Sequence, residues 1–253
     1  MTLELTEKLR KEFMKGLFQI MEDYTNVALL INSCHLAIDR YSKMEQEIHL
    51  STTANIPPPL RLSTEIETTL KKENLIEKYS GDTQQLLFRQ YLVSSIAIFD
   101  SVFEECYEIL ITENEQQLTE KQIGNKVRTA WSNDNLIIYF LDKTQLQIPN
   151  IQTRRIKEAF DRYKELRIIR HSIVHNKSIL SEKHKKQLEE LYNEGDTESK
   201  NKSLKNSPFY QEGEVKLDIN RFLSVRKFIY DLMMYFDNAL MEEEEKIKAA
   251  NTI

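Results

Sequence analysis

The sequence predicts an all-α protein, namely a helical bundle preceded by a long N-terminal helical extension. Hydrophobic residues make up 40% of the 253 residues and charged residues 30%, a balance typical of a helical globular domain. Only five Gly and five Pro are present, whereas strand-rich folds need more turn residues. Apolar residues recur every three or four positions through most of the chain, which is the period of an amphipathic helix.

The N-terminal extension is assigned to residues 1–60. Residues 3–49 carry an apolar period that runs from Leu9 to Ile38, and they are predicted to form one or two long helices. The prolines of the segment 57–59 should then end the helical region, because proline lacks a backbone donor and disfavours helical angles in the residue before it. Core packing is the simplest role for this extension.

The remaining residues, 61–253, are predicted to form one helical domain. A threonine–glutamine capping box, Thr119 to Gln122, marks one helix start. The polar stretch 194–214 contains two Gly and one Pro and is predicted to be a flexible loop. Helices are expected over residues 63–79, 86–111, 119–131, 134–146, 151–174, 183–192 and 217–241, and the very apolar second one should be central.

The cysteines and the apolar runs suggest where the chain resides. Cys34 and Cys106 lie far apart in helical patterns, so both are predicted to be buried thiols of the core rather than a disulfide. Residues 1–13 lack the apolar centre of a secretory signal, and no run approaches the ~18 consecutive apolar residues that span a bilayer. We therefore expect a cytoplasmic protein that has no membrane partner.

Charge is distributed unevenly. The net charge is −5, yet the window from Lys164 to Lys186 holds seven Lys or Arg and two acidic residues, a net charge of +5 that leaves −10 for the rest. A basic patch on an acidic protein suggests phosphate binding confined to one site. An ordinary solvated helix face is the alternative interpretation.

Within this window, six residues place one arginine and two histidines in an apolar helical pattern: Arg170, His171 and His175. Arginine keeps its charge at all physiological pH values and suits phosphate. Histidine takes up and releases a proton near neutral pH. Phosphodiester transesterification needs both properties, so the motif is a candidate RNA-cleaving site.

Helix geometry separates the members of this motif. A turn of ~100° per residue places Lys164, Arg167, His171 and His175 in one stripe, which should face a polyanion or water. Arg170 stands ~100° from His171 and ~140° from His175, near the apolar side of the helix. The motif should therefore form half a site, to be completed by a kink or by a second copy.

An arginine near the apolar side of a helix needs hydrogen-bond acceptors. Asp100, Glu104 and Glu105 are candidates, because they lie on the most apolar predicted helix. In the competing structural interpretation, Arg170 is a buried ion-pair partner and the two histidines are ordinary surface residues.

Other chemistries fit the sequence less well. His171 and His175 have the spacing of paired zinc ligands, but Ser172 stands where a zinc protease has its catalytic glutamate. A zinc site needs further ligands, and His184 is the only other histidine nearby, so neither a metal nor another cofactor is expected. The sequence also contains no phosphate-binding P-loop, no G-x-S-x-G elbow and no C-x-x-C pair.

Arg170, the polar His171 and the following His175 resemble the motif of the HEPN superfamily, whose ribonucleases carry Arg, a polar residue and then His four to six positions after the Arg. The resemblance covers residues 84–240, with the specific signal in the six motif residues. It implies an HEPN-like helical bundle and a metal-independent endoribonuclease whose site forms across a homodimer. Several members are toxins or antiviral effectors controlled by an antitoxin or sensor protein.

The resemblance also implies residue roles. His175 would act as general base on the ribose 2′-hydroxyl, and Arg170 would neutralise charge on the phosphate. His171 would orient the phosphate or tune its neighbours. Further RNA contacts would come from Lys164, Arg167, Asn176 and Lys177. In such a dimer, residues 1–60 could instead enlarge the interface or hold a regulatory partner. The alternative function is a catalytically inactive HEPN-type scaffold that binds a protein partner or a nucleotide.

Overall fold

The computed structural model describes residues 1–45, 49–51, 56–62, 69–133, 135–146, 156–194, 209–211 and 213–251, and most of these residues are helical. The prediction of an all-α protein is therefore confirmed at the level of fold class. The helices are α1 (Leu3–Ser42), α2 (Lys72–Ser80), α3 (Asp82–Asn114), α4 (Glu120–Thr129), α5 (Asn135–Thr144), α6 (Ile156–His175), α7 (Glu182–Glu194) and α8 (Ile219–Ala250). Two 3₁₀ turns, η1 (Pro58–Leu60) and η2 (Ala130–Asn133), accompany the strands β1 (His49–Ser51), β2 (Thr69–Lys71), β3 (Tyr210–Gln211) and β4 (Glu214–Val215).

By its internal packing the chain divides into two units. The larger comprises Met1–Tyr24 and Tyr91–Ile253, and the smaller comprises Thr25–Gln90. Helices α1 and α3 each contribute residues to both units, so the division by packing does not fall at residue 60. All candidate site residues belong to the larger unit.

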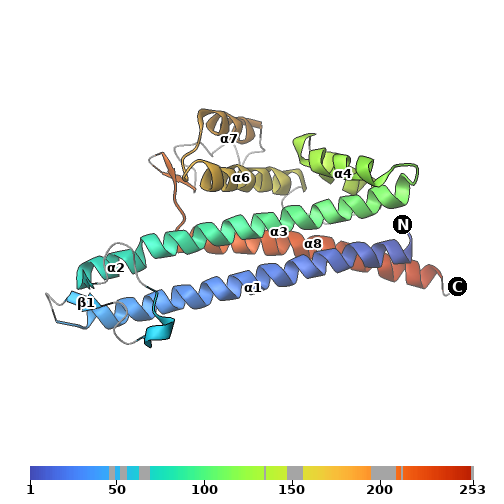
Figure 1. Cartoon of the computed structure of the whole chain (residues 1–253). Helices are drawn as coiled ribbons and strands as arrows, with labels where there is room; N and C mark the ends of the chain where they lie inside the picture. The colour runs from blue at the N-terminus through green and yellow to red at the C-terminus, as the bar shows by residue number, and fades with distance from the viewer. Residues whose placement is uncertain are drawn as a thin grey trace. The chain divides into compact units, whose positions relative to one another are not determined.

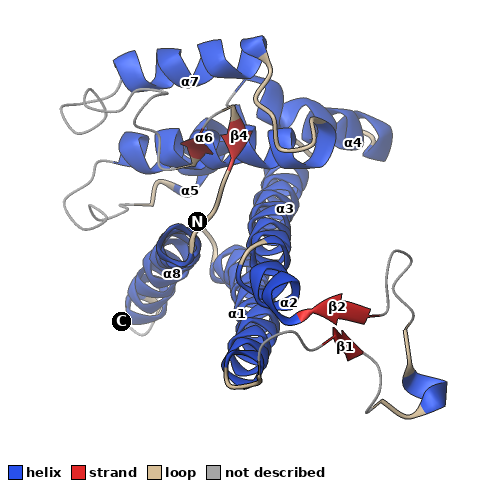
Figure 2. Cartoon of the chain, turned by 90° about the vertical axis from the view of Figure 1, so that its left-hand side faces the viewer, coloured by secondary structure: helices blue, strands red, loops and turns tan. Residues whose placement is uncertain are grey.

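The smaller unit differs from the prediction in two elements. Strand β1 pairs with β2 in an antiparallel ribbon, with Leu50 opposite Leu70, and Figure 2 shows this ribbon beside α2. The helix predicted over 63–79 was therefore wrong at residues 69–71, which form β2, whereas residues 63–68 lie outside the described part. Likewise, α1 ends at Ser42 and His49 belongs to β1. Cross-strand pairing outweighs helical periodicity in such short segments.

In the larger unit, an aromatic cluster joins the helices. The ring centroid of Phe13 on α1 lies 5.5 Å from that of Phe103 on α3 and 5.2 Å from that of Phe236 on α8. Phe140 on α5 lies 5.5 Å from both Phe103 and Phe236. All four rings are buried, and each such pair contributes about 0.5–1.5 kcal/mol to stability beyond the effect of the area it buries.

Figure 1 shows α6 lying along α3, with α7 on the outer side of α6.

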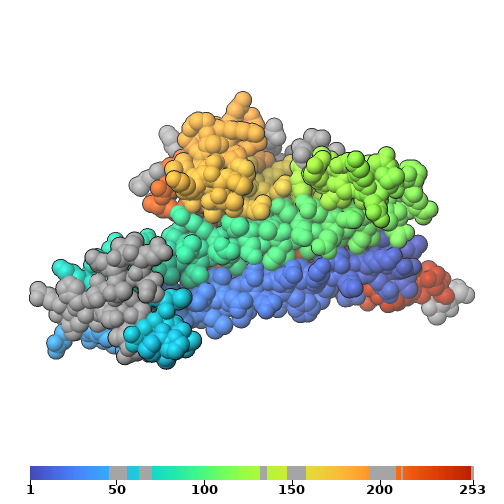
Figure 3. All heavy atoms as spheres, viewed as in Figure 1, coloured from blue at the N-terminus to red at the C-terminus, as the bar shows by residue number. Residues whose placement is uncertain are grey.

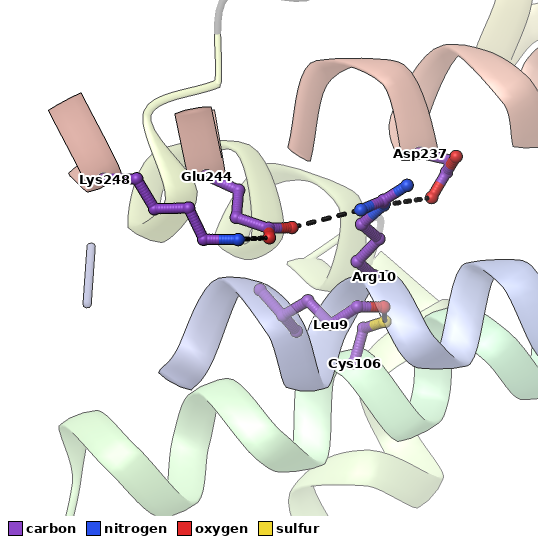
Figure 4. A network of polar contacts seen from close by, with 6 residues as sticks. All are labelled: Leu9, Arg10, Cys106, Asp237, Glu244 and Lys248. Atoms are coloured by element: carbon purple, nitrogen blue, oxygen red, sulfur yellow. Dashed lines mark hydrogen bonds and ion pairs between the residues drawn. The ribbon is translucent and has the colours of Figure 1, made fainter. Parts of the chain in front are cut away.

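A polar network also joins α1 to α8 (Figure 4). The Nε of Arg10 lies 3.1 Å from Asp237 Oδ1, and its Nη1 lies 3.1 Å from Glu244 Oε2. Lys248 pairs with the same glutamate. Because Asp237 is buried, its charge needs this guanidinium partner. The network fixes how α8 lies along α1.

Both thiols are buried and free, as predicted. Cys106 lies in the core of the larger unit, where its Sγ is 4.0 Å from the carbonyl oxygen of Leu9, and Cys34 lies in the smaller unit. Among the described residues, the stretch 72–114 is long and apolar enough to cross a membrane, but 44% of its most apolar window is buried within the protein. The core helix of a soluble protein passes the same test of length and composition.

Gly16 sets the distance between α1 and its neighbours. A Cβ at this position would lie 2.4 Å from Val102 Cγ2 on α3 and 2.7 Å from Met233 Cε on α8. Real side chains do not approach so closely, and the valine methyl group has little freedom to move. The close packing of the three helices therefore requires glycine here.

We expect Gly16→Ala to lower the free energy of unfolding by about 1–2 kcal/mol, because overpacking outweighs the gain in helix propensity. Gly124→Ala in α4 is the matched control, since a Cβ there meets nothing within 4 Å. This second change should raise the free energy of unfolding by about 0.5–1 kcal/mol. Urea titration followed by circular dichroism measures both values, and a stabilising Gly16→Ala would contradict the packing argument.

Candidate functional site

The motif lies at the C-terminal end of α6, where an unusual turn stops the helix. Lys177 and Ser178 have φ angles of 52° and 68°, in the left-handed region of the backbone that residues other than glycine rarely adopt. The backbone N–H of Ser178 donates to the carbonyl oxygen of Ser172 at 2.9 Å. The chain reverses within six residues, and α7 runs back along α6.

A short ribbon holds this turn. The N–H of Val215 on β4 donates to the carbonyl oxygen of Ser178 at 2.7 Å, and Ile179 forms a bridge with Glu214. Strands β3 and β4 pair within the segment predicted as a loop. That prediction was wrong for Glu194, which ends α7, and for residues 210–211 and 214, whereas residues 195–208 and 212 lie outside the described part.

Three histidines gather where α6 faces α7. The ring centroid of His171 lies 4.5 Å from that of His175 and 4.7 Å from that of His184 on α7. The Oγ of the buried Ser172 lies 3.5 Å from His184 Nδ1. The prediction that His171 and His175 share a helix face is confirmed. The sequence motif did not include His184, which folding brings to the cluster from the next helix.

Burial and neighbouring charges lower the proton affinity of two of these histidines. Burial lowers the pKa of His171, and the charges of His175, Arg170 and Lys183 lower it further. Burial and then the charges of His171 and Lys183 likewise lower the pKa of His184. A second proton on three adjacent imidazoles is costly, so these two rings favour the neutral form that can accept a proton.

Arg170 reaches toward α3. Its Nη1 lies 3.8 Å from Oδ2 of the buried Asp100, and its Nε is buried without a hydrogen-bond partner among the described residues. Of the three acceptors considered for this arginine, Asp100 is the one found beside it. Glu105 instead pairs with Lys15 of α1 at 3.3 Å.

Asp100 organises several groups on α6. Arg167 Nε lies 3.2 Å from its Oδ1, and the hydroxyl of Tyr163 donates to the same oxygen at 2.6 Å. Burial raises the pKa of Asp100, and Arg167, Tyr163 and Arg170 offset part of that rise. The pKa of Tyr163 is raised by burial and by Asp100, so its hydroxyl remains a donor. One carboxylate thus anchors two turns of α6.

Trp131 on η2 completes this arrangement. The guanidinium carbon of Arg167 lies 4.1 Å from the centroid of the indole ring, and the indole Nε1 donates to Glu104 at 2.8 Å. Arg167 therefore stacks on an aromatic face and pairs with Asp100, whereas the sequence placed it in a stripe that should face a polyanion or water. The sequence placed Trp131 at the end of a helix and gave no sign of this contact, because only tertiary folding brings η2 to α6.

The other predicted RNA-contacting residues surround the histidines unevenly. Asn176 and Lys177 follow His175 directly in the turn, and the side chain of Lys177 is exposed. Lys164 lies two turns before His171, about 10 Å away along the helix axis. Among the described residues, no group of three or more His, Cys, Asp or Glu side chains is arranged to hold a metal ion.

Protein family models, curated protein sequences and solved structures contain no match to this chain.

The histidine cluster predicts a measurable titration. We expect His171 and His184 to titrate below the value of about 6.5 that is usual for an exposed histidine, and His175→Ala to raise the pKa of His171 by removing a like charge. NMR titration of the imidazole Cε1 protons measures these values. An unchanged His171 pKa in the variant would show that the rings do not interact.

Stability should follow the same direction. Histidines whose folded-state pKa is depressed contribute stability above their unfolded-state pKa, and this contribution is lost as the pH falls through the folded-state pKa. The contribution of the two rings to the free energy of unfolding should therefore decline below about pH 6.5. Urea unfolding of the wild type and of His184→Gln across this range isolates the share of His184.

Proposed function

We propose that the chain is an HEPN-type, metal-independent endoribonuclease that cleaves RNA by attack of the ribose 2′-hydroxyl. The observation that carries the proposal is an arginine positioned by a buried carboxylate at the end of a helix that also presents a cluster of histidines. A fixed positive charge and proton-transferring groups are what phosphodiester transesterification needs. Neither a metal nor another cofactor takes part in this scheme.

His175 acts as the general base. Its side chain is exposed at the end of α6 and can reach a bound strand. It removes the proton of the 2′-hydroxyl, whose oxygen attacks the adjacent phosphorus while the bond to the 5′-oxygen breaks. The products are a 2′,3′-cyclic phosphate and a 5′-hydroxyl, and DNA, which lacks the 2′-hydroxyl, cannot follow this route.

Arg170 and His171 handle the phosphate. The guanidinium of Arg170 neutralises charge that gathers on the nonbridging oxygens, an effect worth roughly 2.7–4 kcal/mol for a single donor. His171, whose pKa is lowered chiefly by burial, accepts or donates a hydrogen bond that orients the phosphate. Lys164, Arg167, Asn176 and Lys177 supply further contacts to the strand.

A homodimer completes the site. Arg170 turns toward α3 while His175 is exposed at the helix end, so one chain does not readily place both groups on one phosphate. A second copy packed against α6 supplies the missing half, and its His175 protonates the leaving 5′-oxygen. We propose a cytoplasmic toxin or antiviral effector, held in check by an antitoxin or sensor protein.

One observation favours a different class of function. Asp100 forms ion pairs with both Arg167 and Arg170. Ion pairs of this kind can be purely structural, so they do not require that the arginines bind a substrate. The second candidate is therefore an inactive HEPN-type scaffold that binds a protein partner or a nucleotide. The two candidates differ in whether the purified chain cuts RNA.

We expect the purified protein to cleave total RNA in the presence of EDTA. Arg170→Ala and His175→Ala should each reduce the rate by about 100-fold or more, because they remove charge stabilisation and proton transfer. His35→Ala is the matched control, since this exposed histidine lies in the smaller unit. Intact RNA under all conditions, with partner binding preserved in the variants, would favour the scaffold.

The dimer is tested by size. Light scattering of the wild type should give twice the chain mass of 30.0 kDa. Excess His175→Ala protein mixed with the wild type should lower the activity per wild-type chain, because a mixed dimer lacks one of the two His175 side chains that the reaction uses. A strict monomer that still cleaves RNA would exclude the shared site.

A further inference from the structure

A groove of about 330 Å³ lies between η2, α6 and α7. Its lining combines Trp131, Lys164, Arg167, Gln187 and Glu190 with two aliphatic side chains. The space-filling view shows α7 forming the outer surface over α6 (Figure 3). The lining therefore joins an aromatic–guanidinium stack to groups that donate and accept hydrogen bonds.

The groove continues from the histidine cluster. Arg167 precedes His171 by one helical turn, and Gln187 follows His184 by three residues on the antiparallel α7. Because the rings of His171 and His184 lie 4.7 Å apart, the next turn along this seam is the groove. A strand whose phosphate reaches the histidines therefore has a neighbouring nucleotide at the groove.

Arg167 forms a rigid platform inside the groove. The indole of Trp131 lies under one face of its guanidinium at 4.1 Å, and Asp100 holds its Nε at 3.2 Å. The side chain of Arg167 is 30% exposed and lines the groove. A planar guanidinium fixed in this way stacks well on a nucleobase, as the aromatic and arginine platforms of RNA-binding proteins do.

We propose that this groove binds the base of a single-stranded RNA nucleotide adjacent to the cleaved phosphodiester. The base stacks on the Arg167 guanidinium, so that indole, guanidinium and base form three layers, and Lys164 binds the nucleotide's phosphate. Glu190 is an acceptor only and faces position 4 of the pyrimidine in this arrangement, so it favours the amino group of cytosine over the carbonyl oxygen of uracil. The inference rests on the proposed ribonuclease function and names the substrate subsite of the same site.

Trp131 allows a direct test, because it is the only tryptophan of the chain and lines the groove. Titration with cytidine 3′-monophosphate should change the indole fluorescence in a saturable manner. Uridine 3′-monophosphate has a carbonyl oxygen in place of the amino group at position 4 and an N3–H in place of the bare N3. It should bind at least about fivefold more weakly, because its position 4 offers Glu190 no donor. Ribose 5-phosphate should produce no saturable change.

Variants of α7 locate the contact. Gln187→Ala should weaken cytidine monophosphate binding several-fold, and Glu190→Gln should bring the ratio of the two affinities toward one. Glu189→Gln is the matched control, since this neighbouring acid does not line the groove, and it should leave both affinities unchanged. Equal effects of the two glutamate changes would contradict the proposal that this groove binds a nucleobase. The absence of a saturable fluorescence change in the wild type would contradict it as well.

Failure of the subsite and failure of the ribonuclease are distinguishable. If the protein binds the nucleotide but does not cut RNA, the proposed base-binding groove is supported and the proposed ribonuclease activity is contradicted. The opposite result is that wild type and Glu190→Gln cut RNA with the same base preference and that the indole fluorescence does not respond to the nucleotide. That result supports the proposed ribonuclease activity and contradicts base binding in the groove.

Discussion

The candidate site depends on one buried carboxylate, that of Asp100 on α3. Removing a carboxylate from water is costly, and the cost is offset only if strong hydrogen-bond partners surround it. Arg167, Arg170 and Tyr163 are these partners, and all three lie on α6. A shift of α6 along α3 would separate the carboxylate from them, so the register of the two helices is fixed by electrostatics as well as by packing.

From this anchor the rest of the site follows in order. The guanidinium of Arg167 stacks on the indole of Trp131, and the indole nitrogen donates a hydrogen bond to Glu104. One turn further along α6, the reversal at Lys177 and Ser178 returns the chain so that His184 meets His171. Helix α6 therefore has two roles. Its face toward α3 holds two arginines against Asp100, and its C-terminal end presents histidines that can exchange protons.

The sequence predicts the helices of this chain well, because a period of 3.6 survives in long segments. It also predicts that His171 and His175 share a face and that Asp100 is among the acceptors for Arg170, since both follow from angles on helices. It does not predict the ribbons of β1–β2 and β3–β4, which are too short to show alternation. Trp131 and the third histidine join the site only through tertiary contacts, which have no local pattern. The catalytic roles and the HEPN assignment remain predictions.

The two thiols divide between the two packing units. Cys34 is 4% exposed in the smaller unit and Cys106 is fully buried in the larger. Burial also raises the pKa of each thiol, so neither forms the reactive thiolate readily. An alkylating reagent would thus modify each cysteine only while its own unit is open. The native chain carries an internal reporter in each unit, and mass spectrometry of the labelled peptides would tell whether the two units unfold together or one before the other.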